Sequence, residues 1–472
     1  MTLVEILIIA LGALALRLVF PGHLRKWGLL AASILAIYWL QPLLPIRNMD
    51  FWFPTATLGV ILLSWALVAD KTQLTFRENI YAILIMVAFV LLIAMTRFIS
   101  LKGLITPSRP PQFSQVVIAL LFLLGLGSLL IYIVKPTPMA IGSGIFGLLA
   151  LFIVLKTPAL ASATSLGLRQ IMAQDTSLAK FTDLGWLGFS YVAFRLIHTM
   201  IDRINGQLKD IQLGEYMVYV LFFPAFIAGP LDRLQHFRQD LENPHPLEAG
   251  ELLQSGKRLA IGLFRKFILA DSLALIALSG GNIQQVIHTG WLWVMLIAYA
   301  LQIYFDFAGY TDIAIASGIL LGFKLPENFN QPYRKPNLTL FWNNWHMSLT
   351  QWFRAYFFFP LTRKLRKANK LSAPLIIFST QMSTMLLIGL WHGVTPNFLI
   401  WGAWHGLGLF FHNRWRAMVS PKLAKVTQHK PVLDDAFQII GIILTFLFVS
   451  LGWVWFRMPT FDLAATTFAK LF

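Results

Sequence analysis

The chain has 472 residues, of which 57% are hydrophobic and only 12% are charged, and its formal net charge is +17. Soluble domains contain about 25% charged residues, so this composition excludes an ordinary soluble protein and indicates a membrane protein of many helices. The chain contains no cysteine. That absence excludes disulfides, thiolate metal sites and a cysteine acyl-enzyme.

Apolar stretches long enough, or nearly long enough, to cross a bilayer recur from one end of the chain to the other. We expect an all-α, polytopic membrane protein with ten to thirteen membrane helices, some of them short, tilted or re-entrant. Residues 1–135 are expected to form an N-terminal layer of membrane helices, and residues 136–472 the core. No basic segment precedes the first apolar stretch, so a cleaved signal peptide is not expected.

Basic residues gather between the apolar stretches, most densely in 363–370 (RKLRKANK) and 414–425 (RWRAMVSPKLAK). The positive-inside rule predicts this distribution for cytoplasmic loops. It accounts for the net charge without nucleic acid, so we expect membrane lipids and no nucleic acid as partners.

Two segments in the middle of the chain interrupt the simple pattern of spans. Arg195, His198 and Asp202 are spaced i, i+3 and i+7, which places them on one helix face. These residues could form a proton relay or an interior polar stripe that aligns neighbouring helices. We favour the stripe. Residues 222–233 (FFPAFIAGPLDR) contain two prolines and a glycine, which predict a kinked or broken helix.

The apolar segment 304–318 (YFDFAGYTDIAIASG) contains Asp306 and Asp312. Carboxylates inside a membrane often mark a path for ions or substrate. They can also pair with an arginine or cap a helix broken beside Gly309, and the sequence leaves both interpretations open.

Two histidine segments follow, and both are too polar for a lipid-facing span. The first, residues 341–360, is aromatic but carries His346 among several amides and hydroxyls, which predicts a tilted or re-entrant helix lining a cavity. The second is a hairpin of two apolar stretches, 374–390 and 397–411. At about 1.5 Å per residue each reaches only about 22–26 Å, against a hydrocarbon core of about 30 Å. We therefore expect the tip, with His392, within the depth of the membrane in a buried aqueous pocket.

His392 and His346 are the candidate catalytic residues, because a buried histidine is costly in a membrane and imidazole is suited to moving a proton near neutral pH. The need for a base that deprotonates a hydroxyl would explain both histidines. Three tryptophans would shape an apolar slot, namely Trp342, Trp345 and Trp391. Gly389 and Gly393 permit close backbone approach. His405 and His412 have two interpretations, and both stay open. They could support or gate the site, or they could only lie near a helix end without a role in it.

The pattern does not favour a metal. No HExxH motif and no HxxxH cluster occurs, and carboxylates are sparse near the histidines. We expect neither a metal nor a bound cofactor.

Six ordered motifs together resemble one family. They are FSYVAFRLIHTMID, FFPAFIAGPLDR, GLFRKFILAD, YFDFAGYTDIAIASGILLGFKLPENFNQPY, FWNNWHMSLTQWFRAYFFFPL and LIGLWHGVTPNFLIWGAWHG. They resemble the membrane-bound O-acyltransferases (MBOAT), and in particular the bacterial branch that includes the alginate O-acetylation membrane protein and the teichoic acid D-alanyl transferase. The resemblance covers roughly residues 140–456.

The resemblance implies a funnel-like helical bundle whose acyl donor enters from the cytoplasm. By its position in LWHG, His392 matches the near-invariant histidine of the family and would act as general base. His346 matches the second active-site position and would orient or polarise the acyl carbonyl. Asn343 and Ser348 would help to hold the site.

The same resemblance implies a donor, a partner and a location. The donor is acetyl-CoA or an acylated carrier protein, and the acetyl group passes across the inner (cytoplasmic) membrane to a cell-surface polysaccharide. A separate extracytoplasmic acetyltransferase or esterase-like protein is the implied partner. Transfer of D-alanine or another acyl group, a transporter and a non-catalytic scaffold remain as alternatives.

Overall fold

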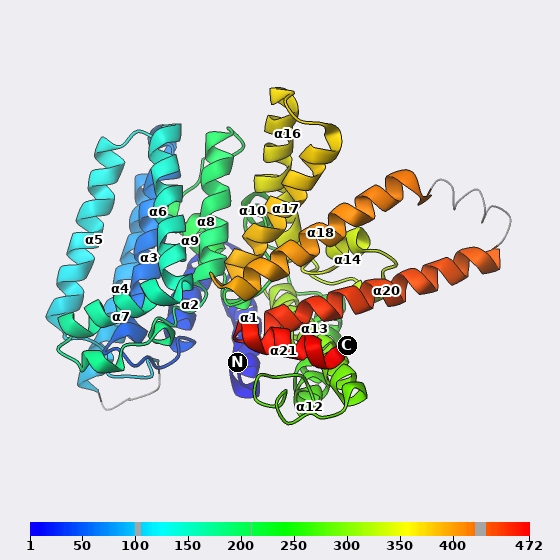
Figure 1. The fold of residues 1–472 in the computed structure, drawn as a ribbon. Helices are drawn as coiled ribbons and strands as arrows, with labels where there is room; N and C mark the ends of the chain where they lie inside the picture. The colour runs from blue at the N-terminus through cyan, green and yellow to red at the C-terminus, as the bar shows by residue number, and fades with distance from the viewer. Residues whose placement is uncertain (100–104, 209, 421–430) are drawn as a thin grey trace. The chain divides into compact units, whose positions relative to one another are not determined.

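Helices account for every regular element in residues 1–99, 105–208, 210–420 and 431–472, the parts that the computed structural model describes (Figure 1). The all-α class predicted from the sequence is therefore confirmed. The helices are α1 (Leu3–Val19), α2 (Gly22–Trp39), α3 (Met49–Val68), α4 (Phe76–Met95), α5 (Phe113–Ile133), α6 (Pro138–Lys156), α7 (Pro158–Ile171), α8 (Phe189–Ile204), α9 (Leu213–Leu221), α10 (Leu234–Glu242), α11 (Ala249–Leu263), α12 (Asp271–Ala274), α13 (Thr289–Leu320), α14 (Leu338–Asn344), α15 (Met347–Phe353), α16 (Phe359–Ala368), α17 (Ala373–His392), α18 (Pro396–Met418), α20 (Pro431–Arg457) and α21 (Phe461–Leu471).

Seven of the described helices, α3, α4, α5, α6, α13, α17 and α20, are long and apolar enough to cross a membrane. The protein is thus a polytopic membrane protein. Other stretches counted among the ten to thirteen expected spans form helices that are shorter, interrupted or less apolar. The stretch near 214–233, for example, contains α9, which has only nine residues.

Contacts divide the chain into two compact units. The first comprises Met1–Leu259 and Ile313–Leu325, and the second comprises Ala260–Asp312 and Pro326–Phe472. In the first unit, α3 packs against α5, α6, α8 and α9, and most of its side chains are buried. The boundary expected near residue 135 falls between α5 and α6.

The polar stripe on α8 holds neighbouring segments of the first unit. Arg195 donates hydrogen bonds to the carbonyl oxygens of Val220 and Ala225, at 2.7 and 2.9 Å. The imidazole of His198 lies 2.9 Å from the hydroxyl of Tyr219, and Asp202 accepts a hydrogen bond from the side chain of Gln235. These contacts support the interpretation that the stripe aligns helices.

The broken helix predicted over 222–233 is confirmed. α9 ends at Leu221, a 3-10 turn follows at Phe223–Ala225, and α10 begins only at Leu234. Because the break is buried, its free carbonyl groups need internal donors, and Arg195 supplies two of them.

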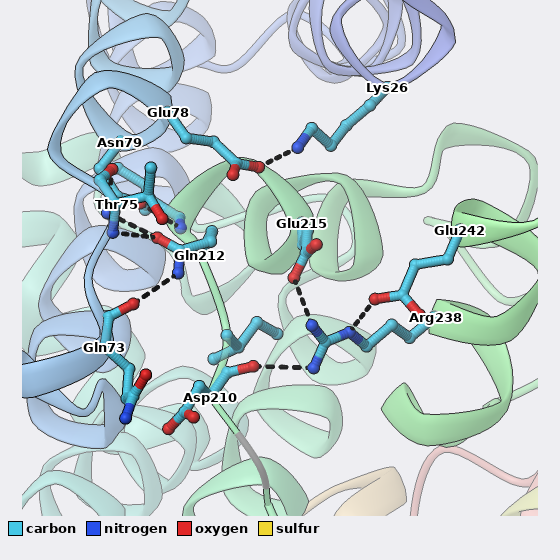
Figure 2. A network of polar contacts seen from close by, with 12 residues as sticks. Lys26, Gln73, Thr75, Glu78, Asn79, Asp210, Gln212, Glu215, Arg238 and Glu242 are labelled. Atoms are coloured by element: carbon cyan, nitrogen blue, oxygen red, sulfur yellow. Dashed lines mark hydrogen bonds and ion pairs between the residues drawn. The ribbon is translucent and has the colours of Figure 1, made fainter. Parts of the chain in front are cut away.

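A second polar network joins the beginnings of α4 and α9 to the middle and end of α10 in the first unit (Figure 2). Gln212, which precedes α9, accepts hydrogen bonds from the backbone N–H of Thr75 and from the side chain of Asn79. Arg238 of α10 lies 3.6 Å from the carboxylate of Glu215 on α9. Charged groups in this unit therefore pair at helix ends.

In the second unit, α17 and α18 form the expected hairpin, and α18 also packs against α20 (Figure 1). The length argument made from the sequence is wrong. α17 has 20 residues and α18 has 23, because the helices continue through residues that were assigned to loops. α17 reaches about 30 Å, the thickness of the hydrocarbon core. His392 is its last residue.

The two basic segments of this unit are also more helical than expected. Residues 363–368 belong to α16, and α18 runs to Met418. The end of the segment 414–425, from residue 421 on, lies outside the described residues.

The hairpin is held together by glycines, as expected for Gly389. A methyl group on Gly389 would lie 2.2 Å from the carbonyl oxygen of Phe398, and one on Gly402 would lie 2.6 Å from that of Met385. The backbones of α17 and α18 therefore approach too closely for any side chain at these positions.

We expect Gly389→Ala to destabilise the protein, because the added methyl group must push the two helices apart. Such overpacking costs about 1–3 kcal/mol. The midpoint of thermal unfolding in detergent measures the effect. Gly147→Ala is the matched control, since nothing lies within 4 Å of a methyl group there. Equal midpoints for the two variants would contradict the close approach.

Candidate active site

The helix expected over 341–360 is broken at His346. α14 ends at Asn344, Trp345 is extended, and His346 adopts a left-handed conformation with φ 43° before α15 begins. Only 4% of His346 is exposed. A left-handed backbone is uncommon for a residue with a side chain and costs about 1–3 kcal/mol, so neighbouring groups must hold it.

The loop that precedes α14 supplies those groups. The side-chain oxygen of Asn328 accepts hydrogen bonds from the hydroxyl and the backbone N–H of Ser348, at 2.6 and 3.2 Å. The backbone N–H of Met347 donates to the carbonyl of Asn328, and that of Asn330 donates to the carbonyl of Asn344. The candidate binding residue Ser348 therefore supports the backbone beside His346.

Trp391 brings the two candidate histidines together. Its ring centre lies 4.4 Å from that of His392 and 6.3 Å from that of His346. His392 also contacts Phe456 at 4.7 Å and Trp401 at 5.4 Å, and it is half-buried. The two imidazoles, 46 positions apart in the sequence, thus share one aromatic neighbour.

A cavity of about 110 Å³ lies against this region within the second unit. Its walls come from α14, α15, the π-helical turn Arg354–Phe358, α17 and α18. The first histidine segment lines this cavity, as predicted, and most of the lining is apolar. It reaches α17 at Ile388, one helical turn before His392. Water around His392 itself remains a prediction.

Polar groups enter the cavity at a few points. Asn343 lines it and accepts a 2.8 Å hydrogen bond from Arg354, which also lines it. Within the described part of the chain, the side-chain oxygen of Gln381 and the indole N–H of Trp342 are buried at the cavity without a hydrogen-bond partner. Unsatisfied groups at an apolar cavity are what a polar portion of a ligand would complete.

The other tryptophan walls lie differently. Trp342 stands between the cavity and His405, with ring centres 5.1 Å apart, and lies 5.8 Å from Trp401. Trp345 packs in the adjoining aromatic core, 5.2 Å from Trp453 and 5.5 Å from Phe341.

The two later histidines, His405 and His412, have different surroundings. His412 hydrogen-bonds the hydroxyl of Thr339 at 2.8 Å, a contact that supports a structural role. His405 is fully buried between Trp342 and Trp401, and neither ring nitrogen has a partner among the described residues. A structural histidine is normally hydrogen-bonded, so His405 is better described as part of the polar groups around the site.

The carboxylates of α13 are paired. Asp306 accepts from Lys266 and Asp312 from Arg265, each at 2.5 Å. These contacts support structural pairing over an ion path. Among the described residues no group of three or more His, Cys, Asp or Glu side chains could hold a metal ion.

Sequence reasoning missed three contributors. Gln381 and Ile388 are spaced seven residues apart on one face of α17, and this helical period was a usable signal. Asn328 acts through a contact with a residue 20 positions away, which no local pattern reveals.

Comparison with known protein families assigns the chain to one of them. The model of the MBOAT, membrane-bound O-acyltransferase family matches residues 146–453. The chain belongs to this family. The match includes both candidate histidines and every residue named here around the cavity.

Relatives in the MBOAT family carry several names. A probable alginate O-acetylase from Pseudomonas syringae is 33% identical over 66% of this chain and 55% of its own length. A teichoic acid D-alanyltransferase from Streptococcus thermophilus is 34% identical over 58% and 68%. A peptidoglycan O-acetyltransferase from Helicobacter pylori is 32% identical over 53% and 45%. The chain thus spans about half the length of the alginate relative.

We expect Asn328→Ala to destabilise the region around His346, because it removes the side-chain acceptor of two hydrogen bonds from Ser348. Each buried hydrogen bond contributes about 0.5–1.5 kcal/mol. Thermal unfolding of the purified protein measures this. Asn330→Ala is the control, since that side chain is exposed. If both variants unfold like the wild type, Asn328 does not hold the break.

Proposed function

We propose that the protein is a membrane-embedded O-acyltransferase of the inner membrane that passes an acetyl group from a cytoplasmic donor to a cell-surface polysaccharide. The observation that carries the proposal is that Trp391 contacts both His346 and His392. Near them lies an apolar cavity with unsatisfied polar groups, which Trp342 and Ile388 line but neither histidine does. Two of the relatives are named as O-acetyl transfer enzymes, which supports the proposal.

In this proposal His392 acts as general base. It takes the proton of the acceptor hydroxyl while the hydroxyl oxygen forms an ester bond to the acyl carbon. The carbon–sulfur bond of a thioester donor breaks, and the departing thiolate receives the proton from His392. His346 donates a hydrogen bond to the acyl carbonyl, where negative charge develops.

The cavity would hold the acyl part of the donor. Of the three tryptophans expected as walls, Trp342 lines this cavity, whereas Trp345 and Trp391 lie outside its lining. The hydrogen-bonded pair of Asn343 and Arg354 offers polar contacts at its edge. The donor is acetyl-CoA or an acylated carrier protein. No bound cofactor is needed, because the donor itself brings the activated acyl group.

The acceptor reaction would involve a second protein. If the hydroxyl that His392 deprotonates belongs to an intermediate acceptor, the acetyl ester formed on it must then be transferred to sugar hydroxyls in the polymer. We therefore propose a separate extracytoplasmic acetyltransferase or esterase-like protein as the partner.

A second candidate is D-alanyl transfer to an envelope polymer. The specific observation in its favour is the similarity to a teichoic acid D-alanyltransferase, of which the match covers 68%. The same two histidines would serve, and the acyl group found on the envelope decides between the two.

We expect His392→Ala, and separately His346→Ala, to abolish envelope esterification. Proton transfer by a positioned side chain contributes about 100-fold or more. The measurement is base-labile acetate, and in parallel D-alanine, on the envelope of a deletion strain rescued with each variant at matched membrane levels. His288→Ala is the control, because that histidine is exposed in a loop.

The outcomes separate the alternatives. Full rescue by His392→Ala would remove catalysis by that residue and favour a scaffold or transporter. If the deletion strain loses envelope D-alanine but keeps its acetate, the transferred group is D-alanine and the proposal of acetyl transfer is wrong.

We also expect Ile388→Phe to lower esterification by roughly tenfold with both histidines intact, because a ring at this position fills part of the cavity and displaces the acyl group. Leu387→Phe places the same ring on the exposed face of α17 and serves as the control. The same envelope ester measurement applies. Unchanged ester with Ile388→Phe would show that the acyl group does not use this cavity.

A further inference from the structure

A second cavity, of about 810 Å³, lies wholly within the first unit. It is found where three candidate spans end, at the beginnings of α3 and α5 and just after α4 (Figure 1). Its lining includes Arg47, Arg97 and Arg109, together with Trp52 and Gln112. The three arginines precede residue 146, so they lie outside the part of the chain that the acyltransferase family model matches.

The loop that carries Arg109 is fixed in place. The neighbouring Ser108 donates to both oxygens of the buried Asp50, from its backbone N–H at 2.8 Å and from its hydroxyl at 2.7 Å. On the other side of Arg109, the carbonyl of Pro110 accepts a 2.6 Å hydrogen bond from Arg97. Arg109 is thus held at the cavity by anchored residues on both sides, although it is itself exposed.

The cavity carries an excess of positive charge. Both oxygens of Asp50 are engaged by Ser108, and no ion pair joins Arg47, Arg97 or Arg109 to a carboxylate within the residues that the structure describes. The helices α3 and α5, of 20 and 21 residues, also begin here and add the positive ends of their dipoles. Three guanidinium groups and two helix N-termini around one cavity suit an oxyanion.

The surroundings indicate where that anion comes from. Ile171 and Trp52 give the cavity an apolar side. Large apolar side chains are exposed beside it, including Phe98 just after α4 and Phe122 on α5, at 70% and 73%. Exposed aromatic rings along candidate spans are expected to face lipid. A site at the end of three spans therefore lies at the level of lipid headgroups.

We propose that this cavity binds the phosphate of an anionic phospholipid, with the acyl chains lying along the exposed apolar face of α5. Arg47 and Arg109 contact the phosphate directly. Arg97 contributes its charge and holds the loop through Pro110. The site does not depend on the proposed acyl transfer.

Native mass spectrometry of the purified full-length chain in detergent tests the proposal. Phosphatidylglycerol is titrated against phosphatidylcholine with identical acyl chains, and the wild type should retain the anionic lipid preferentially. The variant R47A/R109A should bind phosphatidylglycerol about 30-fold more weakly, since each basic residue near an anionic headgroup contributes about fivefold. R109A alone, which changes one exposed residue, should weaken binding about fivefold.

The control K71A/R77A removes the same two charges from the opposite end of α3 and α4 and should bind like the wild type. Three results would overturn the proposal: equal binding of the two lipids by the wild type, an equal loss in both double variants, or complete displacement of phosphatidylglycerol by soluble glycerol phosphate. The last result would assign the cavity to a free phosphate ester. R47K/R109K, which keeps the charges, should retain most of the binding.

Discussion

A helix that breaks inside a membrane leaves backbone N–H and C=O groups which lipid cannot satisfy, and this constraint shapes each unit of the protein. In the second unit the break at His346 is satisfied by the loop that precedes α14. Asn328 accepts from Ser348 and Met347, and Asn330 donates to Asn344. In the first unit the break after α9 is satisfied by Arg195 of α8. Both breaks are therefore built features, since each has dedicated partners.

The second unit does not satisfy every polar group it buries. Near the cavity, His405, Trp342 and Gln381 keep buried nitrogen or oxygen atoms without partners in the described residues. Each such atom costs about 1–3 kcal/mol. The same unit pairs Asp306 and Asp312 with Lys266 and Arg265. Other buried polar atoms of this unit, such as those of Gln302 and Ser450, also lack partners among the described residues. Those of Gln381 and Trp342 differ because they lie at a cavity, where a ligand or water can complete them.

Local chemistry determined which features could be predicted from the sequence. Prolines at 224 and 230 predicted the break after α9, and glycine at 389 predicted the close approach of α17 and α18, because both residues act on their own backbone. The lengths of the hairpin helices were underestimated because polar residues such as His392 were assigned to the loop. The backbone of these residues forms helical hydrogen bonds whatever the side chain, so the helix continues through them. The role of Ser348 could not be predicted, because it depends on Asn328, which only the fold brings close.

The two cavities differ in what they require from outside the chain. The cavity beside the histidines is mostly apolar, and the Asn343–Arg354 contact already engages its guanidinium, so it suits a neutral acyl group better than an anion. The cavity in the first unit presents arginines that pair with no carboxylate among the described residues, and the carboxylate of Asp50 accepts from Ser108, which lines the cavity. Unpaired guanidinium groups at the level of lipid headgroups gain most from a phosphate. The residues outside the matched family region thus add a charge-based contact with the membrane, which the apolar cavity of the second unit does not provide.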